Sequence, residues 1–202
     1  MATKNIKIGL VIMASGLGKR FGGNKLMALL DGKPLIKWII DTTENLFDKR
    51  VVVTRNIEVK AFCDSMNLPC IVHEFPGRND TVRLGLSSLM GEVDYCFFTP
   101  GDQPLIRRES IIKMIEVAKR GEDKIVRPCF GDSVGTPVGF PSRFFDELLH
   151  LPEGKGGNII IQKNEKYLCP VEVQNEYELM DIDTVEDLDN IKKIFMGLIP
   201  FV

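Results

Sequence analysis

Short runs of β-branched and other apolar residues alternate with helical stretches along most of this 202-residue chain. Such alternation is typical of a mostly parallel sheet with helices packed on its faces. Several runs are almost continuously apolar, as expected for strands that helices cover on both sides. We therefore predict an α/β fold. Because no linker, repeat or composition break divides the chain, we expect one domain over residues 1–202.

The hydrophobic periodicity sets the positions of the elements. The predicted strands are Ile6–Met13, Arg50–Thr54, Pro69–His73, Tyr95–Thr99, Lys124–Arg127, Pro137–Phe140 and Leu168–Val173. The predicted helices are Leu35–Leu46, Ile57–Asn67, Thr81–Met90, Glu109–Lys119, Arg143–His150 and Val185–Leu198, the last with Thr184 as its N-cap. In such a sheet the ligand lies beyond the carboxyl ends of the strands, so the residues that follow each strand are the candidates for chemistry.

Composition excludes several classes of protein. The net charge of −2 argues against binding bare nucleic acid through bulk charge, and no apolar run approaches the roughly 20 residues of a membrane span. No signal peptide is visible. The five cysteines form no C-x-x-C pair, and we expect reduced, structural thiols in a cytoplasmic protein.

The loop after the first predicted strand is rich in glycine and in positive charge. Its glycines are Gly16, Gly18, Gly22 and Gly23. They let the backbone turn sharply and let amide groups approach an anion. Arg20 and Lys25 add cations, so the segment predicts a phosphate-binding loop. The alternative is a flexible turn with solvated basic residues.

Two other phosphate motifs fit this loop less well. A P-loop needs glycine where Met13 stands and Ser or Thr where Arg20 stands. A dinucleotide fingerprint needs its third glycine where Phe21 stands. The second strand also ends at Arg55 instead of an acid, which would have to mean a 2′-phosphate. The dinucleotide interpretation stays as an alternative.

Two acidic segments are candidates for a metal site. Asp102 follows a strand that should be buried, where a carboxylate can hold Mg²⁺ against phosphate oxygens. Asp181 and Asp183 are two residues apart and would share one face of an extended segment. Either segment could instead supply turn or helix-capping residues. Carboxylates and a divalent ion opposite Arg20 and Lys25 suit phosphoryl-type transfer by direct in-line attack.

These residues resemble a known signature. The run Met13–Gly22, followed by Asn24-Lys25-Leu26 and Gly32-Lys33-Pro34-Leu35-Ile36, resembles L-A-A-G-x-S-x-R-M-G-x-x-K-L…G-x-P-L-I. That pattern belongs to the nucleotidyltransferases of the molybdenum cofactor family, especially those acting on molybdopterin. Gly101–Pro104 matches the family's G-D-Q-P, and Asp181–Leu188 is similar to its D-I-D-T-P-E-D-L. The resemblance implies a Rossmann-like, three-layer nucleotidyltransferase fold.

The resemblance also implies roles for individual residues. Arg20, Lys25 and Asp102 would be catalytic, and Asp102 would bind Mg²⁺ together with Asp183, with Asp181 in reserve. The implied nucleotide-binding residues are Ala14, Ser15, Gly16, Leu17, Gly18, Lys19, Arg20, Lys25 and Thr81. Thr81 is included because its segment is similar to an element beside the base in related cytidylyltransferases, although Asn79, Asp80 or Thr81 could simply cap a helix. Gly18 stands where the family usually has serine.

Departures from the family pattern gather where the acceptor is expected. Thr136 stands where G-H-P-V-x-F has histidine, and Gly154 and Asn158 stand where L-x-G-D-x-G-A-R has Asp and Arg. The segment Ala14-Ser15-Gly16, with a small residue other than glycine at Ser15, resembles the cytidylyltransferases of the family more than the guanylyltransferases. These features leave nucleotidyl transfer intact and put the acceptor in doubt.

The expected reaction is therefore transfer of CMP from CTP, with GTP as the other candidate donor, to a phosphorylated acceptor, with release of pyrophosphate. The family implies molybdopterin as the acceptor and a molybdoenzyme as a partner. One alternative is nucleotidyl transfer to a sugar- or polyol-phosphate. Another is a non-catalytic carrier that binds a nucleotide or pterin cofactor and delivers it to a molybdenum hydroxylase.

Overall fold

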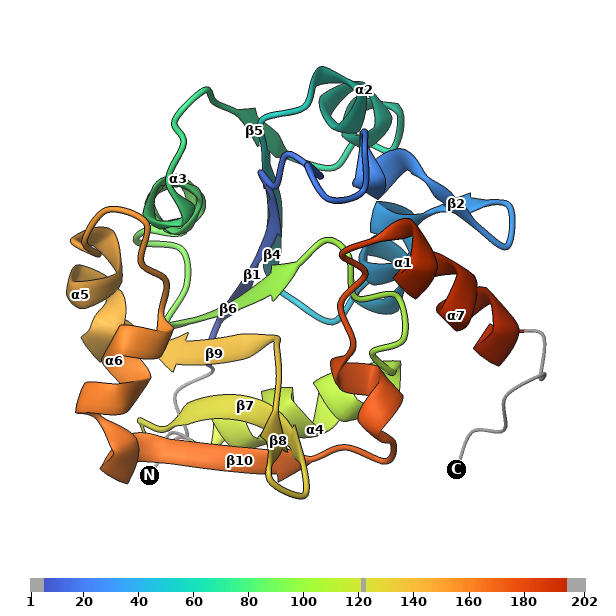
Figure 1. Ribbon diagram of the computed structural model, residues 1–202. Helices are drawn as coiled ribbons and strands as arrows, with labels where there is room; N and C mark the ends of the chain where they lie inside the picture. Colours follow the sequence, from blue (N-terminus) through green and yellow to red (C-terminus); the bar gives the residue numbers. More distant parts are fainter. Residues whose placement is uncertain (1–5, 121–122, 196–202) are drawn as a thin grey trace.

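A mostly parallel sheet forms the centre of the computed structural model, which describes residues 6–120 and 123–195 (Figure 1). The strand order is β10-β7-β9-β6-β1-β4-β5, and β8 pairs with β7. The bounds in this sheet are β1 (Ile8–Ala14), β4 (Lys49–Thr54), β5 (Cys70–Val72), β6 (Tyr95–Pro100), β7 (Ile125–Phe130), β8 (Ser133–Val134), β9 (Val138–Pro141) and β10 (Leu168–Glu172). β9 runs antiparallel to β6 and β7, and β2 (Leu29–Leu30) and β3 (Lys33–Pro34) form a separate hairpin.

Helices cover both faces of the sheet, which makes three layers. The α-helices are α1 (Leu35–Thr42), α2 (Ile57–Ser65), α3 (Arg78–Leu89), α4 (Arg108–Lys119), α5 (Phe145–Leu149), α6 (Asn158–Lys163) and α7 (Val185–Phe195). The 3₁₀ turns are η1 (Lys25–Met27), η2 (Ser142–Phe144), η3 (Glu165–Tyr167) and η4 (Glu176–Leu179). In Figure 1, α3, α5 and α6 lie to the left of the sheet, and α1 and α7 lie to the right.

The alternation of side chains along β1 explains the two main cores. Leu10 and Ile12 are fully buried in a cluster with side chains of α1, α2 and α4. Val11, on the opposite face, is fully buried among side chains of α3, α5 and α6. A third cluster joins α7 to α1. The expected α/β class with a mostly parallel sheet is thus confirmed.

Several predicted boundaries differ from the structure. The helix predicted to start at Thr81 begins three residues earlier, at Arg78, because Gly77 is the N-cap and its amide donates to the Asp80 carboxylate. The stretch Arg143–His150 is divided into η2 and α5. α6 was not predicted, and the end of the last predicted helix, residues 196–198, lies outside the described residues.

Two other sequence expectations have clear outcomes. All five cysteines are free thiols, although only Cys63, Cys96 and Cys129 are buried. Over the described ranges, no helix has the length and apolar character that crossing a membrane would require.

Close packing of α3 on the sheet depends on one glycine. A Cβ atom at Gly85 would lie 2.4 Å from Val11 Cγ1 and 3.1 Å from Val53 Cγ2. This contact holds α3 against β1 and β4, and the N-terminus of α3 therefore reaches the edge where these strands end. A larger residue would push the helix away from the candidate site.

We predict that Gly85→Ala lowers the free energy of unfolding by about 1–3 kcal/mol, the usual cost of overpacking. In a helix without this contact, alanine is more favourable than glycine by about 1 kcal/mol. A loss of stability in Gly85→Ala would therefore come from the steric contact. Urea unfolding measures the change. The control is Ser87→Ala, an exposed position on the same helix, where little change is expected. A Gly85→Ala protein as stable as the parent would contradict the packing argument.

Candidate active site

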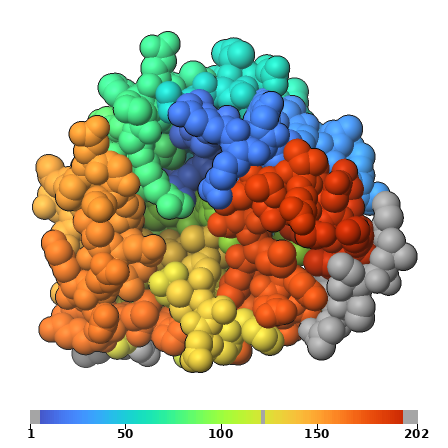
Figure 2. Space-filling view, in the orientation of Figure 1, coloured from blue at the N-terminus to red at the C-terminus, as the bar shows by residue number. Residues whose placement is uncertain are grey.

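A cleft lies at the edge of the sheet where β1, β4 and β6 end. Figure 2 shows the hollow near the centre of the face, between blue residues after β1, green residues before α3 and red residues before α7. We call it the main cleft; its volume is about 440 Å³. Its lining is Ser15, Gly16, Leu17, Gly18, Lys19, Arg20, Lys25, Arg55, Pro76, Asp102 and Asp183. Four cations and two carboxylates therefore face this space, a charge balance that suits a polyanion.

A second space adjoins the main cleft and is called the inner cleft here. It has a volume of about 280 Å³ and shares Ser15, Gly16, Pro76 and Asp102 with the main cleft. Thr81, which is buried, and Arg78 at the start of α3 also line it. Because Asp102 lines both spaces, groups bound in the two clefts would meet beside it.

The glycine loop is a compact turn held by its own backbone. The carbonyl of Gly18 accepts hydrogen bonds from the amides of Phe21, at 2.9 Å, and Gly22, at 3.0 Å. Gly18 has a φ of 59°, and a Cβ atom there would lie 2.3 Å from the carbonyl oxygen of Gly23. This loop therefore requires glycine at the position where the family usually has serine.

One amine joins the acidic residues of the cleft. Lys25 Nζ lies 2.6 Å from Asp102 Oδ2 and 3.3 Å from Asp183 Oδ1, and Arg20 contacts Asp183 Oδ2 at 2.9 Å. The Lys25 side chain is 11% exposed, whereas that of Arg20 is 74% exposed. Burial alone would lower the pKa of Lys25, but Asp102 and then Asp183 attract its charge, and its pKa lies above the usual value. Lys25 is therefore a fixed cation and Arg20 an exposed one.

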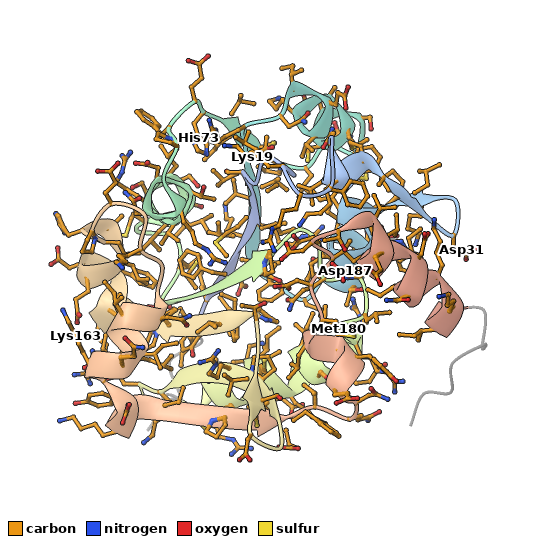
Figure 3. All side chains as sticks on the ribbon, in the orientation of Figure 1. Lys19, Asp31, His73, Lys163, Met180 and Asp187 are labelled. Carbon is orange, nitrogen blue, oxygen red and sulfur yellow. The ribbon has the colours of Figure 1, made fainter. Side chains whose placement is uncertain are left out.

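Backbone contacts bring the two acidic segments together. The amide of Ile182 donates to the carbonyl of Asp102 at 3.1 Å, and the Ile182 side chain is fully buried. Asp187 accepts from the amides of Asp183 and Thr184 and donates its own amide to Thr184 Oγ1. These bonds fix Asp183 at the start of α7, where Thr184 caps the helix as predicted (Figure 3 labels Asp187).

The carboxylates offer partial metal coordination. Asp102 Oδ1 is buried and has no hydrogen-bond partner, while its other oxygen contacts Lys25. Loss of hydration, followed by the charges of Asp102 and Asp183, raises the pKa of Asp181 to about 6. In the parts of the chain that the structure describes, no cluster of three or more His, Cys, Asp or Glu residues is arranged around a metal position. Mg²⁺ commonly takes one or two carboxylates plus substrate oxygens, so an orphaned Asp102 oxygen beside Asp183 fits that ion.

The structure brings most of the sequence-predicted site residues together. Nine of them line the main cleft: Ser15, Gly16, Leu17, Gly18, Lys19, Arg20, Lys25, Asp102 and Asp183. Thr81 lines the inner cleft. Ala14 is buried below the loop, where its carbonyl accepts a hydrogen bond from Thr54, and it lines neither cleft. Asp181 lies near Asp102 and Asp183 but also lines neither.

Two contributors from neighbouring strands were not among the predicted site residues, although Arg55 was noted for the dinucleotide alternative. Arg55 follows β4 and lines the main cleft. His73 follows β5, is buried, and places Nε2 2.8 Å from Ser15 Oγ, which in turn donates to the carbonyl of Val53 (Figure 3 labels His73). Burial, and then the charge of Arg55, lowers the pKa of His73. Their position directly after strands was the available signal.

The family assignment agrees with this geometry. The family profile described as the MobA-like NTP transferase domain matches residues 10–167. The chain belongs to the MobA-like NTP transferase family. It is accordingly a nucleotidyltransferase, as expected from the glycine loop and the G-D-Q-P motif.

The family's curated relatives cover most of this chain. A protein of Aquifex aeolicus named as a probable molybdenum cofactor guanylyltransferase is 27% identical over 187 residues, which is 91% of this chain and 89% of that one. The 2-phospho-L-lactate guanylyltransferase of Methanobrevibacter ruminantium is 26% identical and covers 79% of this chain and 71% of its own. Both relatives are named as guanylyltransferases, so the expected preference for CTP finds no support in them.

Solved structures share this fold. The crystal structure of Rv0371c from Mycobacterium tuberculosis H37Rv has a TM-score of 0.83 at 21% identity, covering 93% of this chain and 98% of that one. A second structure of Rv0371c, with a TM-score of 0.76, is a complex with manganese.

The raised pKa of Asp181 generates a stability prediction. Its folded-state pKa of about 6 lies above the ordinary 3.8, so its negative charge costs stability above pH 6 and costs nothing below pH 4. Asp181→Asn should therefore raise the unfolding temperature at pH 7.5, with a smaller gain at pH 4.5, in thermal unfolding without metal. Asp132→Asn, an exposed turn position, is the control. Equal gains at both pH values would contradict the raised pKa of Asp181.

Proposed function

We propose that this protein transfers a nucleoside monophosphate from a nucleoside triphosphate to a phosphorylated small molecule, using Mg²⁺ and releasing pyrophosphate. The observation that carries the proposal is the contact of Lys25 with both Asp102 and Asp183 inside a cleft that also contains the glycine loop. Cations for a triphosphate and acids for a divalent ion thus meet at one place.

The residues of the cleft supply positioning and charge. Lys25 and Arg20 pair with carboxylates of the chain, and phosphate oxygens can replace those carboxylates as partners. The bent loop presents its backbone to the same oxygens. Asp102 and Asp183 would hold Mg²⁺, which when bound would offset phosphate charge. Phosphoryl transfer depends on alignment and charge stabilisation, so the acceptor phosphate attacks the α-phosphorus directly and no protein nucleophile is needed.

The base of the donor nucleotide can be proposed from the relatives and from the contacts of Ser15. Ser15 favoured CTP in the sequence, but its hydroxyl is already engaged with His73 and the carbonyl of Val53, which gives it a role in holding the loop. Because the two curated relatives are named as guanylyltransferases, we propose GTP as the donor, with CTP as the second candidate.

The acceptor can be proposed from the names of the relatives and from the position of Asp102. The relatives' names make molybdopterin the first acceptor to test, with a phosphorylated small acid as another. Attack on the α-phosphorus requires the acceptor phosphate to lie near Asp102, on the side of the inner cleft.

Two measurements test the proposal and the donor. Thermal unfolding with GTP, CTP, ATP or UTP, each with Mg²⁺, should show the largest stabilisation for GTP; a ligand at 100 times its Kd adds about 2.7 kcal/mol. Pyrophosphate release with each acceptor then separates an enzyme from a carrier. Stabilisation without release from any donor and acceptor pair would favour the carrier.

Replacing one carboxylate tests the chemistry. We predict that Asp102→Asn lowers Mg²⁺-dependent pyrophosphate release by a factor on the order of 100 or more, because it removes a metal ligand and the partner of Lys25. Asp132→Asn removes one exposed carboxylate that does not line the cleft and should keep full activity. Turnover of Asp102→Asn within a few-fold of the parent, with the fold intact, would remove Asp102 from the mechanism.

A further inference from the structure

We propose that a cavity beside the inner cleft binds the body of the acceptor, and that the acceptor is a phosphate ester of a compact apolar group. This inference rests on the proposed function and names, in place of the molybdopterin that the relatives' names suggest, the acceptor class of the same site. The cavity, called the side cavity here, lies between the sheet and the helices α3, α5 and α6, on the left of Figure 1. Its volume is about 210 Å³.

The inner wall of the side cavity is apolar. Six buried side chains from α3, the sheet, α5 and α6 contribute to it: Val82, Phe98, Val138, Phe140, Leu148 and Ile161. Each of them is at most 7% exposed. These six side chains offer no partner for hydroxyl or amide groups, and burying those groups without partners is costly. The polar side chains of Thr136 and Asn158 also line the cavity, but the Thr136 hydroxyl already contacts Gln103 Oε1 and Asn158 is exposed. The inner wall therefore favours a hydrocarbon surface over a sugar, a polyol or a pterin ring.

Positive charge is confined to the rim. Arg78 and Lys155 line the cavity and are exposed, and Arg78 forms no salt bridge among the described residues. The backbone of Gly156 lies beside the Arg78 side chain, since a Cβ atom at Gly156 would be 3.4 Å from Arg78 Cδ. The amide of Gly154 donates to Asn79 Oδ1 at 2.9 Å, which ties the rim loop to the start of α3. An anion at this rim would find a cation with room for a new partner.

The rim connects the side cavity to the reacting centre. Met13 and Arg78 line both the side cavity and the inner cleft, and Asp102 lines the inner cleft. An acceptor with its apolar part in the side cavity and its phosphate at Arg78 thus points that phosphate toward Asp102. This is the direction that attack on the α-phosphorus requires.

Two of the departures from the family pattern lie in the loop at the rim of the side cavity. Gly154 and Asn158 replace residues that carry charge in the resembling pattern, so the rim loop presents Lys155 as its charged side chain to the cavity. A Cβ at Gly157 would lie 2.8 Å from Phe140 Cζ, which means that the loop packs directly on an aromatic ring. At about 210 Å³ the space is also smaller than the roughly 300 Å³ at which pockets for drug-sized ligands begin.

The test compares two phosphate monoesters of equal charge and similar size, isobutyl phosphate and glycerol 3-phosphate. Isothermal titration of the full chain with each ester, in Mg²⁺ and without nucleotide, should give about tenfold tighter binding of isobutyl phosphate, because buried methyl and methylene groups replace hydroxyls. Equal binding, or tighter binding of glycerol 3-phosphate, would overturn the proposal.

Two variants separate the apolar wall from the rim cation. Ile159→Asn changes a half-buried wall residue and should reduce the preference for isobutyl phosphate at least about fivefold. Arg78→Ala should weaken both esters alike. Lys163→Ala, on the exposed end of α6, is the matched control and should change neither (Figure 3). An unchanged preference in a folded Ile159→Asn protein would overturn the proposal, and if that variant does not fold, the ratio in the parent protein decides alone.

The outcome is distinguishable from failure of the proposed function. Ester binding is measured without nucleotide, whereas nucleotidyl transfer is measured as pyrophosphate release. A tenfold preference without any release would leave the side cavity as an ester-binding site and overturn transfer. Release with glycerol 3-phosphate but without selectivity for the alkyl ester would keep transfer and overturn the apolar acceptor.

Discussion

The site depends on a shielded amine that is shared by two carboxylates from distant parts of the chain. Lys25 is near the N-terminus, Asp102 follows β6 and Asp183 precedes α7, so their ion pairs join three separate segments. Such a cluster is stable only while its charges balance, since removing one partner leaves a charge in a poorly hydrated place. A bound triphosphate and a divalent ion satisfy the same requirement, because one supplies anions to the amine and the other supplies a cation to the acids.

The sequence predicted those site residues that come directly after a strand. The loop from Ser15 to Lys25 and the acid Asp102 were predicted because each comes at the end of an apolar run, and both line the main cleft. Local patterns could not reveal pairing across space. Nothing near Ser15 in the sequence indicates that His73 holds its hydroxyl, and Arg55 reaches the cleft only because β4 lies beside β1.

Element boundaries failed for physical reasons of their own. α3 starts at Arg78 because Gly77 serves as its N-cap and Asp80 accepts a hydrogen bond from the Gly77 amide. The polar residues that follow Gly77 are also common N-caps, so the sequence placed the start of the helix too late. α6 has six residues and follows a glycine-rich loop, so it is too short to give a clear helical period. Both elements line the side cavity, and the acceptor half of the site was therefore the harder half to predict.

The direction of β9 divides the two halves of the site. Because β9 is antiparallel to β6, its first residue, Val138, lies opposite Phe98 near the end of β6. Residues on the donor side thus follow the carboxyl ends of strands. Thr136, which lines the side cavity, instead precedes the first residue of β9. Insertions or replacements in the turn before β9 can remodel acceptor choice while the triphosphate machinery stays untouched, which gives this architecture a modular route to new substrates.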